Sequence, residues 1–209
     1  QYLFFCDFNF CAKQKLQPDE FYFNSERHPS GNESVQIAAS GPDSPTSTIM
    51  LSVLKAINLA KKEILITTPY FVPGETILNA LKVAALGGVS VKILAPGISD
   101  LKLVNAAAWS YFDDLLKAGV EIFLYLKGFI HVKTMVVDDY VSVVGTANMD
   151  YRSFDLNFEV NAVVYGEKLA ADLRRTFLKD IKDSEQIQPE VWSARPLLKK
   201  LPERIARLL

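Results

Sequence analysis

The sequence has little of what several common functions require. Its 23 Lys and Arg are matched by 24 Asp and Glu, so no chain-wide basic field exists to hold a polyanion, and we expect no nucleic-acid partner. Two cysteines, Cys6 and Cys11, are too few for a disulfide framework or a four-thiolate zinc site, and we expect reduced, packed thiols. Of the two histidines, His131 has no partner at the spacing of a zinc helix, so we expect neither a metal nor a cofactor.

Long apolar runs are also missing. No stretch reaches the roughly 20 residues that span a bilayer, so we expect no transmembrane segment in this chain. The chain starts at Gln1 without an initiator Met or a signal-peptide pattern, and we expect it to be a piece of something longer.

What remains is an ordinary globular composition, 49% apolar over 209 residues. Residues 1–40 differ from the rest, and we set them apart from a main domain at 41–209. Their aromatic opening at residues 2–10 predicts a core strand, residues 35–39 predict a first strand of the sheet, and a polar loop is expected at 28–32.

From Thr46 onward, helical and strand periodicities alternate with short connections. We predict a helix after the N-cap candidates at 44–47, further helices at 74–86 and 100–118, and strands at 64–66, 89–93 and 120–126. This alternation predicts an α/β fold, a layered domain with a mixed, mostly parallel sheet flanked by helices. After Gly128 we predict closely spaced strands at 131–137, 140–144 and 157–164, a turn at Asp138-Asp139 and a helix at 167–183.

The chemistry-bearing pattern is H-x-K-x-x-x-x-D at 131–138, followed by Gly145-Thr146-Ala147-Asn148. Strand alternation would place His131 and Lys133 on one face and Asp138 on the other, so we expect Asp138 to brace the fold. An imidazole, an ammonium, an amide donor from Asn148 and a nearby carboxylate from Glu159 suit a metal-free attack on a phosphodiester.

This pattern resembles the HKD motif of the phospholipase D superfamily, and the run at 145–160, GTANMDYRSFDLNFEV, is similar to bacterial cardiolipin synthases. So are SGPDSP at 40–45, TPYFVP at 68–73 and KGFIHVK at 127–133. The likeness spans about residues 40–209 and corresponds to the second, C-terminal HKD half of such an enzyme. Residues 1–40 would then be a remnant of the preceding half and a linker.

The resemblance implies a phospholipase D-like fold and a phosphatidyltransferase that joins two phosphatidylglycerols into cardiolipin, with release of glycerol, through a phosphohistidine. It implies catalytic roles for His131, Lys133 and Asp138, the last mostly structural. Lys133 and Asn148 would hold the phosphate, and Glu159 would hydrogen-bond to the histidine.

The implied partners are phosphatidylglycerol and cardiolipin, an anionic membrane surface and a second HKD domain, and the parent protein would lie at the bacterial cell membrane. His28 cannot supply the second motif, because Ser30 and Val35 stand where Lys and Asp are required. Leu101 and Trp109 depart from the polar residue and the Arg expected at their positions.

Several alternatives stay open at this point. The chain could be a homodimeric single-HKD phosphodiesterase acting on phospholipid or nucleic acid, or a lipid-binding module without turnover. Arg152 and Ser153 could contact a lipid phosphate or form a structural loop pair. The basic C-terminal segment from Glu190, with Trp192 as an anchor, could pack on the domain or lie on an anionic membrane.

Overall fold

A computed structural model describes residues 1–17, 31–98 and 100–207, apart from the side chains at positions 102, 197 and 199. The chain divides into two compact units, residues 1–32 and 33–209, and each is described by itself. His28 and Ser30, and most of the loop expected at 28–32, lie outside the described residues.

The aromatic opening is a helix, α1 (Tyr2–Ala12), so the predicted core strand is wrong. Aromatic residues favour strands, but here their spacing serves a helix: Phe4 and Phe8, one turn apart, stack with ring centroids 5.5 Å apart. The helix ends at Ala12, and the next residue, Lys13, adopts a left-handed backbone conformation. Both cysteines are free, as expected, but exposed rather than packed.

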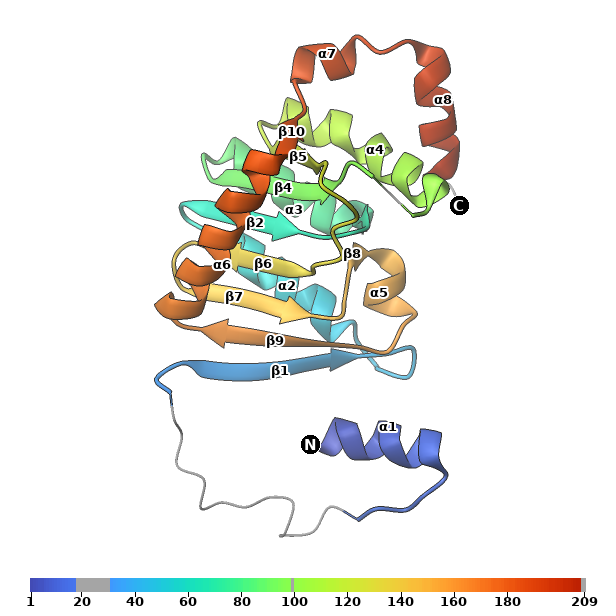
Figure 1. Ribbon diagram of the computed structural model, residues 1–209, viewed down its shortest axis with the longest axis vertical. Coiled ribbons are helices and arrows are strands. Elements are labelled where there is room, and N and C mark those ends of the chain that lie inside the picture. Colours follow the sequence, from blue (N-terminus) through green and yellow to red (C-terminus); the bar gives the residue numbers. More distant parts are fainter. Residues whose placement is uncertain (18–30, 99, 208–209) are drawn as a thin grey trace. The chain divides into compact units, whose positions relative to one another are not determined.

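The second unit is built on an eight-stranded sheet with the strand order β1-β9-β7-β6-β2-β4-β5-β10 among the described residues (Figure 1). The strands are β1 (Ser34–Ser40), β2 (Glu63–Thr67), β4 (Ser90–Pro96), β5 (Glu121–Tyr125), β6 (Thr134–Val137), β7 (Val141–Gly145), β9 (Glu159–Tyr165) and β10 (Ser184–Gln186).

The sheet is mixed, as predicted, but the expectation of mostly parallel pairing is wrong. Only β2 with β4 and β4 with β5 pair in parallel among these strands, and the other neighbours are antiparallel. The parallel part coincides with the segment where helices separate the strands. The antiparallel part includes the hairpin of β6 and β7, whose turn is the predicted Asp138-Asp139, because so short a connection cannot join parallel strands.

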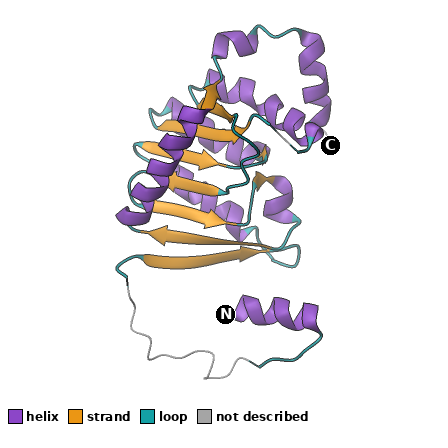
Figure 2. Ribbon diagram, viewed as in Figure 1, coloured by secondary structure: helices purple, strands orange, loops and turns teal. Residues whose placement is uncertain are grey.

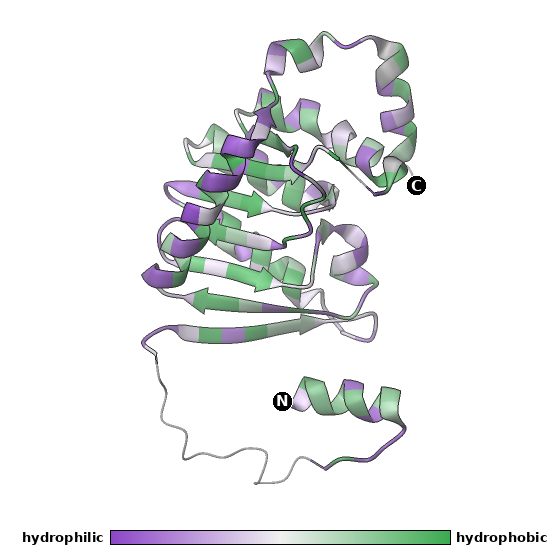
Figure 3. Ribbon diagram, in the orientation of Figure 1, coloured by the Kyte–Doolittle hydropathy of each residue, from purple (hydrophilic) through white to green (hydrophobic). Residues whose placement is uncertain are grey.

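Helices cover both faces of the sheet (Figures 1 and 2). On one face lie α2 (Thr48–Leu59), α3 (Gly74–Leu86) and α4 (Lys102–Lys117), and on the other lies α6 (Glu167–Asp180), followed by the short 3₁₀ helix η1 (Ile181–Asp183). The larger apolar core lies under α2 to α4, and a smaller one under α6 is formed around Ala170 and Phe177. Figure 3 shows strands that are mostly hydrophobic beneath an α6 rich in hydrophilic residues, which is the amphipathic pattern of a covering helix.

The C-terminal segment forms α7 (Pro189–Ser193) and α8 (Leu197–Ala206), which pack on α4. Trp192 contacts Trp109 with ring centroids 5.7 Å apart, so Trp192 is the anchor that was expected. The guanidinium of Arg195 lies 3.4 Å from the centre of the Trp192 ring and makes a bidentate bridge to Glu203 at 2.7 and 2.9 Å. These contacts support the packed interpretation of the segment.

Ion pairs also hold α8 and the residue that follows it. Lys200 bridges to Asp113 at 3.1 Å, and Arg207 bridges to Glu75 at 2.6 Å. Apolar side chains of α8 nevertheless remain exposed, namely Leu198, Leu201 and Ile205. Within the described ranges, no helix combines the length and the apolar character needed to cross a bilayer.

Candidate active site

The candidate residues gather at one end of the central strands, which we call the site end of the sheet. It comprises the end of β2 at Thr67, the start of β6 at Thr134, the end of β7 at Gly145 and the start of β9 at Glu159. The antiparallel register places these positions beside one another. The other ends of the same strands, around Glu63 and Val137, form the opposite end.

His131 and Lys133 lie in the segment that precedes β6, because the strand begins at Thr134 and not, as predicted, at residue 131. The structure brings the two side chains together: the Lys133 Nζ lies 3.1 Å from each ring nitrogen of His131 and donates to the His131 carbonyl at 3.0 Å. The ammonium can donate only to an unprotonated ring nitrogen.

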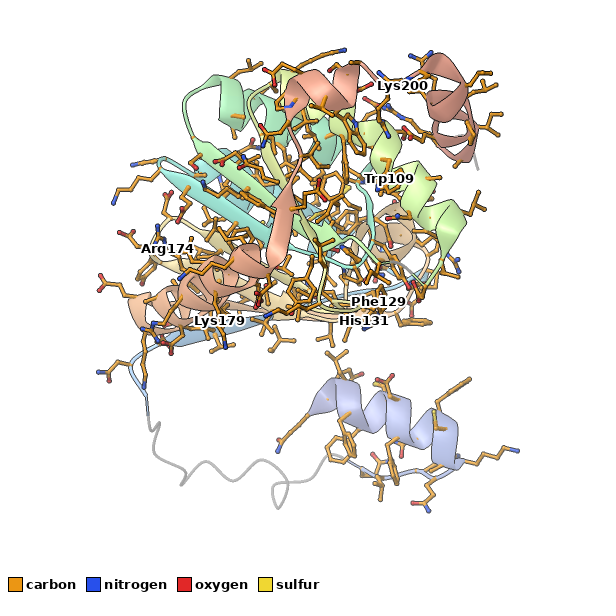
Figure 4. The ribbon with its side chains drawn as sticks, turned by 45° about the horizontal axis from the view of Figure 1, so that its top comes forward. Trp109, Phe129, His131, Arg174, Lys179 and Lys200 are labelled. Carbon is orange, nitrogen blue, oxygen red and sulfur yellow. The ribbon has the colours of Figure 1, made fainter. Side chains whose placement is uncertain are left out.

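Two aromatic rings flank the His131 imidazole. Phe129 lies 5.5 Å away between ring centroids, and Tyr70 lies 6.3 Å away in an edge arrangement. Figure 4 shows Phe129 and His131 side by side. The imidazole itself is exposed, so it is accessible to a substrate.

Burial lowers the pKa of Lys133, and the carboxylates of Glu159 and Asp150 oppose that shift. A partly desolvated ammonium interacts more strongly with an anion than a fully hydrated one does. Lys133 is therefore suited to stabilising charge on a phosphate.

Asn148 and Lys133 line the same shallow, solvent-open pocket. Its other polar lining comes from Thr67, Thr68, Thr134 and Asn161, and its apolar lining from Val53, Met135, Val143, Ala147, Met149 and Phe154. The Asn148 Oδ1 is buried without a hydrogen-bond partner among the described residues. The fold therefore leaves this acceptor unused among the described residues.

The Gly145–Asn148 turn is fixed from β9. A Cβ at Gly145 would collide with the Asn161 Oδ1 and lie 2.5 Å from the Val160 carbonyl oxygen, so only glycine fits. The Asn161 Oδ1 accepts the Ala147 N–H at 3.3 Å, and the Thr146 Oγ1 accepts the Val160 N–H at 2.9 Å. These bonds place Asn148 at the site end.

Behind Asn148 stands the short helix α5 (Tyr151–Asp155), which follows β8 (Met149–Asp150); β8 pairs in parallel with β3 (Phe71–Val72). Ser153 is buried, accepts the Asn148 N–H at 3.1 Å, and donates its own N–H to the Asp150 carboxylate at 2.7 Å. Ser153 thus has a structural place, while Arg152 is exposed.

Glu159 lies at the site end but does not hydrogen-bond to His131. Its carboxylate accepts the Asn157 Nδ2 at 3.3 Å and acts on Lys133 through space. In the described part of the chain, the polar partner of the imidazole is Lys133 and not a carboxylate.

Asp138 lies at the opposite end of the sheet. Its carboxylate accepts the backbone N–H groups of Lys61, Lys62 and Glu63 at 2.8 to 3.3 Å. Its backbone is left-handed, with φ of 53°, as aspartate tolerates in a turn. The predicted opposite-face placement is wrong, because β6 holds only Thr134–Val137 and Asp138 lies in the turn beyond its far end. The bonds to the three N–H groups nevertheless give Asp138 a bracing role.

The sequence reasoning did not single out Tyr70 and Asp150. Asp150 is an N-cap residue whose buried carboxylate lies in the electrostatic surroundings of Lys133. Burial and the hydrogen bond to Asp100 raise the pKa of Tyr70 to about 12. The D-x-x-S pattern at 150–153 could have indicated the cap, but nothing local indicates that Tyr70 meets a residue 30 positions away.

The chain is similar to known proteins over most of its length. It is 47% identical to a cardiolipin synthase of Listeria welshimeri over 87% of this chain and 38% of that protein, and 45% identical to cardiolipin synthase 1 of Staphylococcus aureus (strain COL) over 100% of this chain and 43% of that protein. It therefore spans about two fifths of these relatives.

The fold matches a solved structure of a phospholipase D family member, Nuc from Salmonella typhimurium, with a TM-score of 0.65 and 24% identity over 75% of this chain and 99% of that one. The family model described as cardiolipin synthase, PLD-like domain, matches residues 53–181. The chain belongs to this family of phospholipase D-like domains.

Proposed function

We propose that this chain is the C-terminal catalytic half of a phospholipase D-type cardiolipin synthase, a phosphatidyltransferase of phospholipid biosynthesis. The observation that carries the proposal is the convergence of His131 and Lys133 beside the pocket lined by Asn148. The relatives that bear the name cardiolipin synthase support the choice of lipid substrates.

The reaction consists of two displacements at phosphorus. First, a ring nitrogen of one histidine attacks the phosphorus of a phosphatidylglycerol; an N–P bond forms, the P–O bond to the headgroup glycerol breaks, and glycerol leaves with a proton from a second histidine. Then a hydroxyl of another phosphatidylglycerol gives its proton to that second histidine and attacks; an O–P bond forms, the N–P bond breaks, and cardiolipin is released.

This chain contributes one of the two imidazoles, His131. Lys133 and Asn148 would stabilise the charge that grows on the non-bridging phosphate oxygens. The second imidazole must come from another HKD domain, either an N-terminal half of the same protein or a second copy of this chain. Because the substrates are membrane lipids, the working enzyme acts at an anionic membrane surface of the bacterial cell.

The test replaces His131 by Ala in the full-length gene product and measures cardiolipin formed from labelled phosphatidylglycerol. We expect a loss of at least about a thousand-fold, because a missing nucleophile or acid disables both displacements. His28→Ala is the matched control, as it removes the other histidine of the chain and should retain activity. Undiminished cardiolipin synthesis by His131→Ala would refute the proposal.

A homodimeric single-HKD phosphodiesterase is the second candidate, because the fold covers nearly all of the Nuc chain and so occurs as a unit of this size. Sedimentation of the 209-residue chain separates the two. A dimer that cleaves phospholipid or nucleic acid without transferring a phosphatidyl group would favour this candidate, whereas an inactive monomer would favour the half-enzyme.

A further inference from the structure

The orientation of the His131 ring depends on the few groups that contact it. Its ring nitrogens contact one flexible ammonium, that of Lys133, and no carboxylate within the described residues. A lysine side chain has four rotatable bonds and can leave when phosphate binds, so it does not define a ring orientation by itself. The lasting constraints on the imidazole are therefore its neighbouring rings.

Tyr70 is the better anchored of those rings. It lies between β2 and β3, with its ring nearly perpendicular to that of His131 at 78° and 6.2 Å from the ring of Phe129. The hydroxyl of Thr68 donates to the Tyr70 carbonyl at 2.8 Å and also accepts the Met149 N–H at 3.1 Å. The backbone at Tyr70 is thus fixed to β8.

The Tyr70 hydroxyl is fixed separately. It donates to the Asp100 carboxylate at 2.8 Å. Asp100 lies between β4 and α4, so the bond joins two connections at the site end that come from neighbouring parallel strands. With its pKa raised to about 12, Tyr70 stays protonated and keeps donating at neutral and mildly alkaline pH.

We propose that Tyr70 and Asp100 form a positioning pair for His131: Asp100 holds the Tyr70 hydroxyl, and the Tyr70 ring holds the imidazole at the angle that in-line attack on phosphorus requires. The expected effect on kcat rests on the proposed function. The expected effect on the orientation of the His131 ring does not. Neither residue touches the reacting atoms, and both act through His131.

The kinetic test compares four variants of the full-length gene product. Tyr70→Leu removes the flat ring, and we expect kcat to fall about a hundred-fold, the usual cost of a misplaced catalytic group, with KM within about two-fold of wild type. Tyr70→Phe and Asp100→Ala keep the ring but release its end, and kcat should fall about ten-fold. Asp100→Asn retains an acceptor for the hydroxyl and should restore most of the activity.

A second readout does not depend on turnover. In the 209-residue chain, His28→Ala leaves His131 as the single histidine, and ¹H–¹⁵N NMR of its ring reports tautomer and surroundings. We expect the ring signals to shift or broaden in Tyr70→Leu and Asp100→Ala. The matched control, Tyr140→Phe, alters an exposed tyrosine in the turn at the opposite end and should leave them unchanged.

The outcomes are separable. If Tyr70→Leu and Asp100→Ala leave both the ring signals and kcat unchanged while remaining folded, the positioning pair is refuted. An equal fall in kcat for Asp100→Asn and Asp100→Ala would also refute it, because hydrogen bonding to Tyr70 would then not matter. If instead His131→Ala retains full activity, the proposed function fails. The NMR comparison then still tests whether Tyr70 and Asp100 orient the His131 ring.

Discussion

A single sequence motif, residues 131–138, runs from one end of β6 to the other, and the polar groups at its two ends have different roles. At the opposite end, Asp138 accepts three backbone N–H groups, and nearby Arg174 bridges to Glu63 at 2.7 Å. At the site end, His131 is exposed and the Asn148 Oδ1 has no partner among the described residues. Seven residues of near-extended chain span up to about 23 Å, so one motif serves stability at one end and chemistry at the other.

Lys133→Met tests whether the site end serves activity and not stability. Of the three variants Lys133→Met, Asp138→Ala and Gly145→Ala, it should cause the largest loss of activity. We expect activity to fall about a hundred- to a thousand-fold, because one charged donor to the phosphate is lost. Burial lowers the pKa of Lys133, so its charged form carries a stability cost at all pH values below that lowered pKa. The variant should therefore melt at the same temperature as the wild type or higher. A marked drop in melting temperature would contradict the division.

Asp138→Ala should produce the reverse pattern. It leaves three N–H groups of the α2–β2 connection without their shared acceptor, and we expect the free energy of unfolding to fall by about 3 kcal/mol, from the usual worth of hydrogen bonds to a charged group. Urea unfolding followed by circular dichroism measures it, with Asp139→Ala as the control, because the Asp139 pair with Lys62 is exposed. A loss of activity without a loss of stability would indicate that Asp138 takes part in catalysis and does not only stabilise the fold.

Gly145→Ala should affect both stability and activity, because Gly145 lies at the site end. We expect its effect on the free energy of unfolding to be smaller than that of Asp138→Ala. The added methyl group meets the Val160 carbonyl and the Asn161 side chain, and we expect a destabilisation of about 2 kcal/mol, typical of overpacking, together with a displaced Asn148. Gly31→Ala is the matched control, since a Cβ there meets nothing within 4 Å. Equal unfolding free energies for the two variants would show that the close approach is unimportant.

Local pattern predicted the elements well where the chain alternates helices and strands. The helix at 74–86 has the predicted limits because its apolar face ends at Gly87-Gly88. The pattern failed for α1, whose aromatic residues suit either structure, and for the start of β6, since periodicity does not tell where pairing stops. Parallel pairing was overestimated because strand direction depends on the partner chosen across the sheet.

The sequence predicted the residues of the candidate site that face the ligand. It did not predict the residues that hold them in position. His131, Lys133 and Asn148 stand in a short motif, so sequence spacing identifies them. Tyr70 and Asp100 are 30 residues apart, and Asn161 reaches Gly145 and Ala147 from another strand. Such contacts depend on tertiary packing, which no local spacing encodes.

The pairing of β1 with β9 has a consequence for how the protein is made. Ser34 lies beside Tyr165 and Ser40 beside Glu159, so β1 emerges from the ribosome long before its partner exists. At about 5–20 residues per second, the delay is roughly 6–25 s, during which β1 has an unpaired edge and its Val35 and Ile37 have no sheet to join. Asn161, which holds the turn before Asn148, also arrives with β9. The polypeptide thus completes its candidate phosphate site only as this late strand is synthesised and docks.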